Sequence, residues 1–297
     1  MDKLIKGTAA DGTIRFMAAI TTEITTEAIR RHQTSPTISA ALGRVMTGTL
    51  LLGSSLKEFD RLTVKIECEG AVKGITAEAT TDGKVRGYVK NPHIELPPKD
   101  NGKFDVSGII GKGMFYVIRE SGFDIGLHRE PYVGSVPIVS GEIAEDFAYY
   151  LAKSEQIPSA VLLGVLLQNA EPFVKASGGV MIQIMPGANE HIITIIEDTI
   201  AHAPHITSVI SEGASAEDLV KLALGEIDFS ILEERQIKFE CNCSFERAVS
   251  LISSLGHKEV ASMLKEDKGA QMTCGFCSEI YTLDEADLQK MLETSAN

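Results

Sequence analysis

The sequence contains no tryptophan and only 6% aromatic residues, and its 28 lysine and arginine residues are outnumbered by 41 acidic ones. The resulting net charge of −13 disfavours a broad electrostatic grip on nucleic acid or on an anionic membrane. The scarcity of aromatic side chains argues further against a surface on which single-stranded bases stack. We therefore expect neither a nucleic-acid partner nor a membrane partner.

The sequence also lacks an apolar run of about 18 residues that could span a bilayer, and its first residues lack the apolar region of a secretory signal. These absences predict a cytoplasmic protein. Cysteines are scarce too, with five in 297 residues. In a reducing compartment such cysteines more often bind metal, catalyse or sense oxidants than form structural disulfides.

A phosphate-binding P-loop is missing as well. The pair Gly111-Lys112 would need a glycine five residues before it and a serine or threonine after it. Those positions hold Val106 and Gly113. The sequence therefore indicates no nucleotide-driven machine.

The pattern of apolar residues predicts a mixed fold. Residues 62–68 alternate between apolar and polar side chains, which is typical of a strand with one buried face and makes Cys68 an ordinary buried thiol. Further elements are predicted as helices at 37–56 and 142–152 and as buried strands at 161–167 and 180–185. Because these elements follow no regular βαβ order, we expect the α+β class, with a mixed core domain, a helical linker and a small C-terminal module.

Charge and patterning together predict three regions. Residues 212–297 hold 17 acidic and 8 basic residues, so most of the negative charge lies in the last third. Asn189 and Ser215 are suited to cap helices. Residues 226–240 contain apolar side chains between acidic ones, and this segment needs a neighbouring domain to bury its apolar side chains. We predict an N-terminal core at 1–180, a helical linker region at 181–240 and a C-terminal domain at 241–297.

Four of the five cysteines form two close pairs in the C-terminal domain. Cys241-Asn-Cys243 and Cys274-Gly-Phe-Cys277 supply four soft thiolates, the donor set of a closed tetrahedral zinc site. The 57 residues from Cys241 onward are too few for a core to suffice without such a staple. We therefore expect one Zn²⁺ per chain in the reduced form, in a structural site because four cysteines leave no open coordination position.

The residues alone leave several functions open for this module. It could be a zinc knuckle that serves stability only, or a thiol–disulfide oxidoreductase that uses Cys274 and Cys277, whereas a nucleic-acid-binding ribbon fits poorly with its acidic surroundings. A redox role is physically reasonable, since thiolates are the oxidisable form of cysteine and neighbouring cysteines are natural disulfide partners.

The sequence resembles the redox-regulated heat-shock chaperonin family of about thirty-three kilodaltons, the heat shock protein 33 family, over nearly its whole length. The two cysteine pairs are similar to that family's C-terminal switch. Three further stretches carry the resemblance: RRHQTSPTISAALGR at 30–44, VSGEIAEDFAYYL at 139–151 with SEQIP at 154–158, and GGVMIQIMPG at 178–187.

The resemblance implies a non-enzymatic, ATP-independent holdase that is inactive when reduced and zinc-bound. Oxidation would join Cys241 to Cys243 and Cys274 to Cys277, release zinc, and unfold the module with its linker. The apolar surface so exposed would bind unfolding client proteins. The resemblance also implies a homodimer in the oxidised state and later transfer of clients to ATP-dependent foldases.

Overall fold

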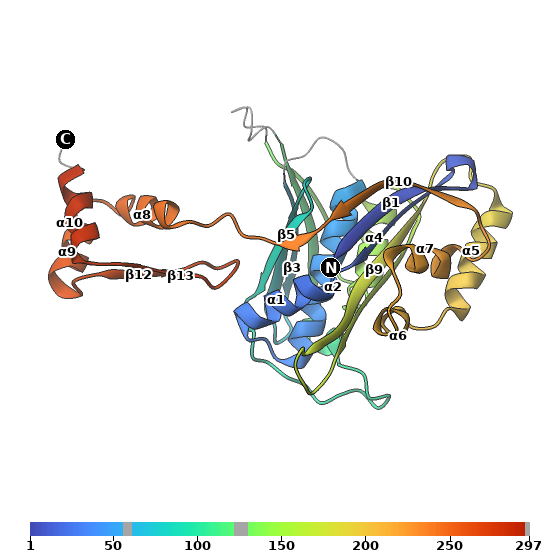
Figure 1. Cartoon of the computed structure of the whole chain (residues 1–297), viewed down its shortest axis with the longest axis horizontal. Coiled ribbons are helices and arrows are strands. Elements are labelled where there is room, and N and C mark those ends of the chain that lie inside the picture. Colours follow the sequence, from blue (N-terminus) through green and yellow to red (C-terminus); the bar gives the residue numbers. More distant parts are fainter. Residues whose placement is uncertain (56–60, 122–129, 295–297) are drawn as a thin grey trace. The chain divides into compact units, whose positions relative to one another are not determined.

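The computed structural model describes residues 1–55, 61–121 and 130–294. The chain forms two compact units, Met1–Glu240 and Cys241–Asn297 (Figure 1). Mixed helices and sheets confirm the predicted α+β class. No helix within the described ranges is long and apolar enough to cross a membrane. The functional division at residues 180 and 240 stays a prediction.

One sheet of the first unit has five antiparallel strands in the order β10-β1-β2-β9-β8. These strands are β1 (Lys3–Ala9), β2 (Ile14–Ile20), β8 (Ser159–Leu167), β9 (Val174–Ile184) and β10 (Phe229–Gln236). The predicted buried strands at 161–167 and 180–185 lie in β8 and β9. A short turn with positive φ at Asp11 and Gly12 joins β1 to β2.

The second sheet has six strands in the order β11-β5-β4-β3-β6-β7. These are β3 (Arg61–Cys68), β4 (Gly74–Thr80), β5 (Lys84–Val89), β6 (Gly113–Glu120), β7 (Tyr132–Pro137) and β11 (Lys238–Phe239). The predicted alternation in β3 is confirmed, because its apolar side chains are buried and its polar ones are partly exposed. Cys68 is partly buried and packs against the core, and burial raises the pKa of its thiol.

Helix α2 (Pro36–Ser55) contacts strands of both sheets and is buried along most of its length, so it forms the centre of the larger core. The predicted helix at 37–56 is thereby confirmed, except that Leu56 lies outside the described residues. Helix α4 (Ala144–Lys153) confirms the helix predicted at 142–152. The remaining helices of this part are α1 (Thr22–His32) and α3 (Val106–Ile110).

A second core lies between the five-stranded sheet and helices α5 (Glu190–His202), α6 (Ile206–Ser211) and α7 (Ala216–Leu224), which Figure 1 shows in gold. Both predicted helix caps are present. The Asn189 side chain accepts a hydrogen bond from the backbone N–H of His191, and the Ser215 hydroxyl accepts one from the backbone N–H of Asp218. The helical character predicted for 181–240 therefore holds between residues 190 and 224.

The last part of that region is not helical, which corrects the sequence-based description. Phe229–Gln236 is the edge strand β10, and Lys238–Phe239 is β11, which pairs in parallel with β5. The physical reason is tertiary: β1 and β5 each offer an open row of backbone donors and acceptors, and pairing with them outweighs local propensity. Ile237, between the two strands, is buried in the larger core.

The second unit contains helices α8 (Phe245–Ser253), α9 (His257–Glu266) and α10 (Glu285–Thr294) and a hairpin of β12 (Ala270–Thr273) and β13 (Ile280–Leu283). Its core has few fully buried residues, namely Ile252, Val260, Leu283, Leu288 and Met291. A core of this size gives only marginal folding stability unless a metal ion or a disulfide also cross-links the unit.

Candidate metal centre

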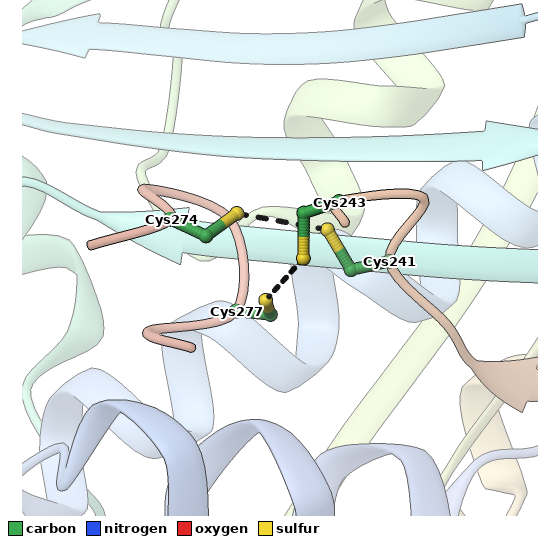
Figure 2. Close-up of side chains that lie close together, drawn as sticks. All are labelled: Cys241, Cys243, Cys274 and Cys277. Carbon is green, nitrogen blue, oxygen red and sulfur yellow. Dashed lines mark hydrogen bonds between the residues drawn. The ribbon is translucent and has the colours of Figure 1, made fainter. Parts of the chain in front are cut away.

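The second unit brings its four cysteine side chains together. The four sulfur atoms all lie within 4.8 Å of one another. The sulfur of Cys241 lies 3.7 Å from that of Cys274, and the sulfur of Cys243 lies 3.3 Å from that of Cys277. Figure 2 shows these sulfur atoms facing one another across two loops, so each close contact joins one cysteine of the first pair to one of the second.

The first loop is held by the start of helix α8. The Ser244 hydroxyl accepts a hydrogen bond from the backbone N–H of Arg247 at 3.3 Å and so caps the helix. The Arg247 guanidinium in turn donates to the backbone carbonyl of Asn242 at 2.9 Å. This bond reaches the residue between Cys241 and Cys243, and it fixes the loop that presents both thiols.

The second loop is the turn of the β12–β13 hairpin. The backbone N–H of Cys274 donates to the carbonyl of Glu279, and that of Ser278 donates to the carbonyl of Cys274, each at 2.8 Å. Ser278 has a positive φ of 57°, which lets the chain reverse tightly. Cys274 and Cys277 therefore lie on one short, hydrogen-bonded turn with their sulfur atoms on the same side.

This arrangement fits a soft divalent metal ion. A tetrahedral site with metal–sulfur bonds of about 2.3 Å has sulfur atoms about 3.8 Å apart. The Cys241–Cys274 and Cys243–Cys277 contacts of 3.7 and 3.3 Å are close to that spacing, and the four sulfur atoms all lie within 4.8 Å of one another. Burial raises the pKa of the Cys277 thiol, whose residue is only 1% exposed, and that of the Cys243 thiol. A bound cation would favour the thiolates that burial alone disfavours. Within the described residues, these cysteines form the only group of three or more potential ligands close enough to share an ion.

Comparisons with known proteins agree with this geometry. The family model described as "Hsp33 protein" matches residues 2–284. The chain belongs to the Hsp33 family. It is 47% identical to the 33 kDa chaperonin of Listeria monocytogenes serotype 4a over 98% of both chains. It is 42% identical to that of Desulforamulus reducens over 98% of this chain and 97% of the relative.

A solved Hsp33 structure shares the fold. The crystal structure of the 33 kDa chaperonin from Thermotoga maritima matches with a TM-score of 0.90 and 36% identity, covering 99% of this chain and 98% of that one. The family resemblance found in the sequence is thus confirmed, and this chain is an Hsp33-family chaperone with a four-cysteine cluster.

One polar contact to the cluster was not predicted from the sequence. The Tyr281 hydroxyl, on β13, donates to the sulfur of Cys243 at 3.1 Å, and this hydrogen bond raises the pKa of Tyr281. The run Ile280-Tyr-Thr-Leu283 has strand-forming residues, so it could have indicated the hairpin that carries the tyrosine. A donor to a ligand sulfur is the kind of outer contact that orients a metal ligand in this Hsp33 module.

Replacing Tyr281 with phenylalanine is expected to weaken metal binding about tenfold without unfolding the reduced module, because one hydrogen bond to a ligand is lost and the ring is kept. Competition between the protein and a colorimetric chelator for zinc measures the change. Ser262→Ala, which removes a hydroxyl that bonds the exposed Glu266 of α9 away from the sulfurs, is the matched control. Equal affinities in Tyr281→Phe and Ser262→Ala would show that the tyrosine hydroxyl does not support the ligand.

Proposed function

We propose that this Hsp33 chain is a redox-regulated, ATP-independent holdase. In the reduced state Cys241, Cys243, Cys274 and Cys277 hold one Zn²⁺ and the protein is inactive. Oxidation of the four cysteines to two disulfides releases the metal and activates the binding of unfolding proteins. The observation that carries the proposal is the convergence of four sulfur atoms within 4.8 Å in a unit with a very small core.

The role of the metal is structural. Four thiolates complete a tetrahedral shell and leave no position for a water nucleophile. When bound, zinc supplies a cross-link between the Cys-Asn-Cys loop and the hairpin turn. The chain's own contribution is to hold these two loops, through Arg247 and the turn at Ser278, so that their sulfur atoms face one another.

The redox step converts the two zinc-bound thiolates of each pair into one disulfide. Each new S–S bond releases two electrons, and one molecule of hydrogen peroxide accepts them together with two protons from the solvent and becomes two molecules of water. We propose the pairing Cys241–Cys243 and Cys274–Cys277. Disulfides within each pair leave the two loops unlinked. Disulfides along the short contacts of the reduced form, Cys241–Cys274 and Cys243–Cys277, would instead join the two loops covalently and keep the module cross-linked. Peptide mapping by mass spectrometry distinguishes the two pairings.

Unfolding of the module would free the neighbouring end of the linker region, residues 226–240, which is called the linker from here on. The chain runs directly from Glu240 of the linker into Cys241, and Glu240 forms ion pairs with Lys84 and Lys238. The linker's apolar residues Phe229 and Ile237 pack against the two cores of the first unit. Their release would expose apolar surface on both the linker and the sheets, and such surface binds other apolar chains.

The alternative function is a thiol–disulfide oxidoreductase that uses Cys274 and Cys277. Reactive cysteines of that class lie at a helix N-terminus, which lowers the thiol pKa. Here the two cysteines lie in a hairpin turn, and burial raises the pKa of Cys277. The holdase is therefore the better-supported function. We propose unfolding proteins as its clients, a homodimer as its oxidised form, ATP-dependent foldases as the recipients of its clients, and the cytoplasm as its compartment.

Light scattering of a thermally unfolding test protein tests the proposal. The peroxide-treated chain is expected to suppress aggregation, and the reduced, zinc-loaded chain is expected not to. About one zinc ion per chain is expected to be released as the four cysteines of the cluster are oxidised. Cys68→Ser is the control for the fifth cysteine and is expected to switch normally. Equal suppression by both redox states, or turnover of a disulfide substrate by the reduced chain, would contradict the holdase switch.

A further inference from the structure

Strand β10 of the linker covers an edge of the five-stranded sheet that would otherwise be open. It pairs with β1 in antiparallel register from Lys3 opposite Gln236 to Ala9 opposite Phe229, with one irregularity between Lys6 and Gly7 (Figure 1). The opposite edge of β1 is paired with β2. Without β10, β1 would therefore present a row of unpaired backbone donors and acceptors along one side.

The contact between β10 and β1 has an aromatic anchor. Phe229 packs edge-on against Phe16 of β2, with ring centroids 5.3 Å apart and planes at 82°. A Cβ atom added at Gly7 of β1 would lie 2.0 Å from the Ser230 carbonyl oxygen of β10 and 2.5 Å from the Phe16 ring. Gly7 thus lets both the backbone of the edge strand and the Phe16 ring approach β1 closely.

Two ion pairs lie further along the same two strands. Lys3 lies 2.6 Å from Glu234 and Lys6 lies 2.7 Å from Glu233, measured between the charged atoms. All four side chains are partly exposed, so these pairs contribute little stability. They nevertheless give the β1 edge a positive rim that complements an acidic strand.

Strand β10 itself is held loosely along its middle. Leu232 is 70% exposed and Ile231 is 40% exposed, although both are apolar. An edge strand with such exposed apolar residues buries little area per residue, so its release costs less than that of an inner strand. The same residues show that the β1 edge accepts apolar side chains without a close-fitting pocket.

We infer that the β1 edge is a client-binding site of the activated protein, in which an extended segment of an unfolding protein replaces β10 and adds a strand to the sheet. An aromatic or large aliphatic side chain of the client takes the place of Phe229 against Phe16. This inference rests on the proposed function, in which oxidation frees the linker.

An unfolded chain is the partner that this edge suits best. Main-chain hydrogen bonds provide most of the attraction in strand addition, and every polypeptide carries those groups. Sequence specificity is then low. A client segment needs only one apolar side chain that packs against Phe16, and acidic residues that reach Lys3 and Lys6 increase its affinity. A native protein keeps its own backbone paired, so the edge discriminates unfolding from folded chains.

Hydrogen exchange of the full-length chain tests the inference directly. The amides of residues 3–9 that face β10 are expected to be protected in the reduced protein, to exchange rapidly after oxidation, and to regain protection when an unfolding client is added. Unchanged exchange on addition of client, while aggregation is still suppressed, would overturn the β1 site and leave the holdase function standing. Failure of the oxidised protein to suppress aggregation would instead overturn the proposed function.

The exchange pattern also separates the client from a second copy of this chain. A swapped β10 from another molecule would protect both residues 3–9 and residues 229–236 in the oxidised protein without any client. That result would overturn the inference, because the edge would already be filled.

Competing peptides test the strand geometry. A synthetic peptide of residues 227–239 added in excess is expected to displace most of the client from the oxidised protein. Two versions carry backbone N-methyl groups, one at Phe229 and Ile231 and the other at Asp228 and Ser230. Because successive N–H groups of a strand point to opposite sides, only one of the two versions is expected to compete. Equal competition by both would contradict strand addition, and undiminished competition by a Phe229→Ala peptide would contradict the Phe16 anchor.

Discussion

Cys274→Ser is expected to remove both the metal and the fold of the C-terminal unit. Structural zinc contributes on the order of 10 kcal/mol of apparent folding free energy, and a hydroxyl is a poor replacement for a soft thiolate ligand. The core of this unit, with few fully buried side chains, cannot offset a loss of that size. The same result is expected for each of the other three cysteines of the cluster, because each supplies one quarter of the shell.

Two measurements check this prediction on the full-length protein. Zinc content by atomic absorption is expected to fall from about one ion per chain to near zero. Hydrogen exchange is expected to become fast across α8, α9, α10 and the hairpin, and across the linker strands β10 and β11 with the β1 amides that face β10, while the other strands of the first unit remain protected. Cys68→Ser is the matched control, since Cys68 packs against the other core and is expected to leave metal and exchange unchanged. A folded, metal-free Cys274→Ser module would show that the core suffices alone.

The sequence was most informative where its signal is local. Helix α2, the caps at Asn189 and Ser215, and the alternation in β3 follow from residue spacing and capping chemistry, and all three were predicted. The four-cysteine cluster was predictable for a similar reason. Two short cysteine pairs place four soft donors in positions where one ion can gather them, whatever fold lies between.

What the sequence did not reveal depends on contacts between distant segments. Residues 229–236 are strand β10 only because β1, more than two hundred positions earlier, offers an edge. The hairpin that carries Cys274 and Cys277 is stabilised by its own pairing and by Leu283 in the small core, and Tyr281 reaches Cys243 only once that hairpin has formed. Patterns within a single window carry no record of such partners.

Ile237→Ala is expected to activate the reduced, metal-loaded protein in part. Ile237 is 5% exposed and belongs to the larger core, and its γ2 carbon lies near the turn at Gly83. Truncation of a buried isoleucine to alanine costs about 2–5 kcal/mol. If the linker alone bears that cost, the population with a released linker rises by at least about 30-fold, since each 1.4 kcal/mol is a factor of ten.

Leu232→Ala provides the matched control, because it removes an apolar side chain of the same size from the same linker at a position that is 70% exposed. It is expected to change linker release only slightly. Light scattering with both reduced variants, together with hydrogen exchange of residues 229–239, measures the difference. A count of five thiols per denatured chain, the four of the cluster and Cys68, and full zinc content must accompany the activity of Ile237→Ala, so that activation is separated from loss of the metal site. Equal behaviour of the two variants would show that burial of Ile237 does not hold the linker in place.

Combining Cys274→Ser with Ile237→Ala in one chain tests whether the cysteine cluster and the linker act in one sequence of events. If loss of the metal site activates the protein by releasing the linker, Cys274→Ser already produces the released state, and adding Ile237→Ala is expected to increase activity little further. Residues that act through a shared step show such non-additivity, whereas independent sites add. Additive activation in the double variant would mean that the module and the linker control client binding separately, and the direct chain connection from Glu240 to Cys241 would then have no part in the switch.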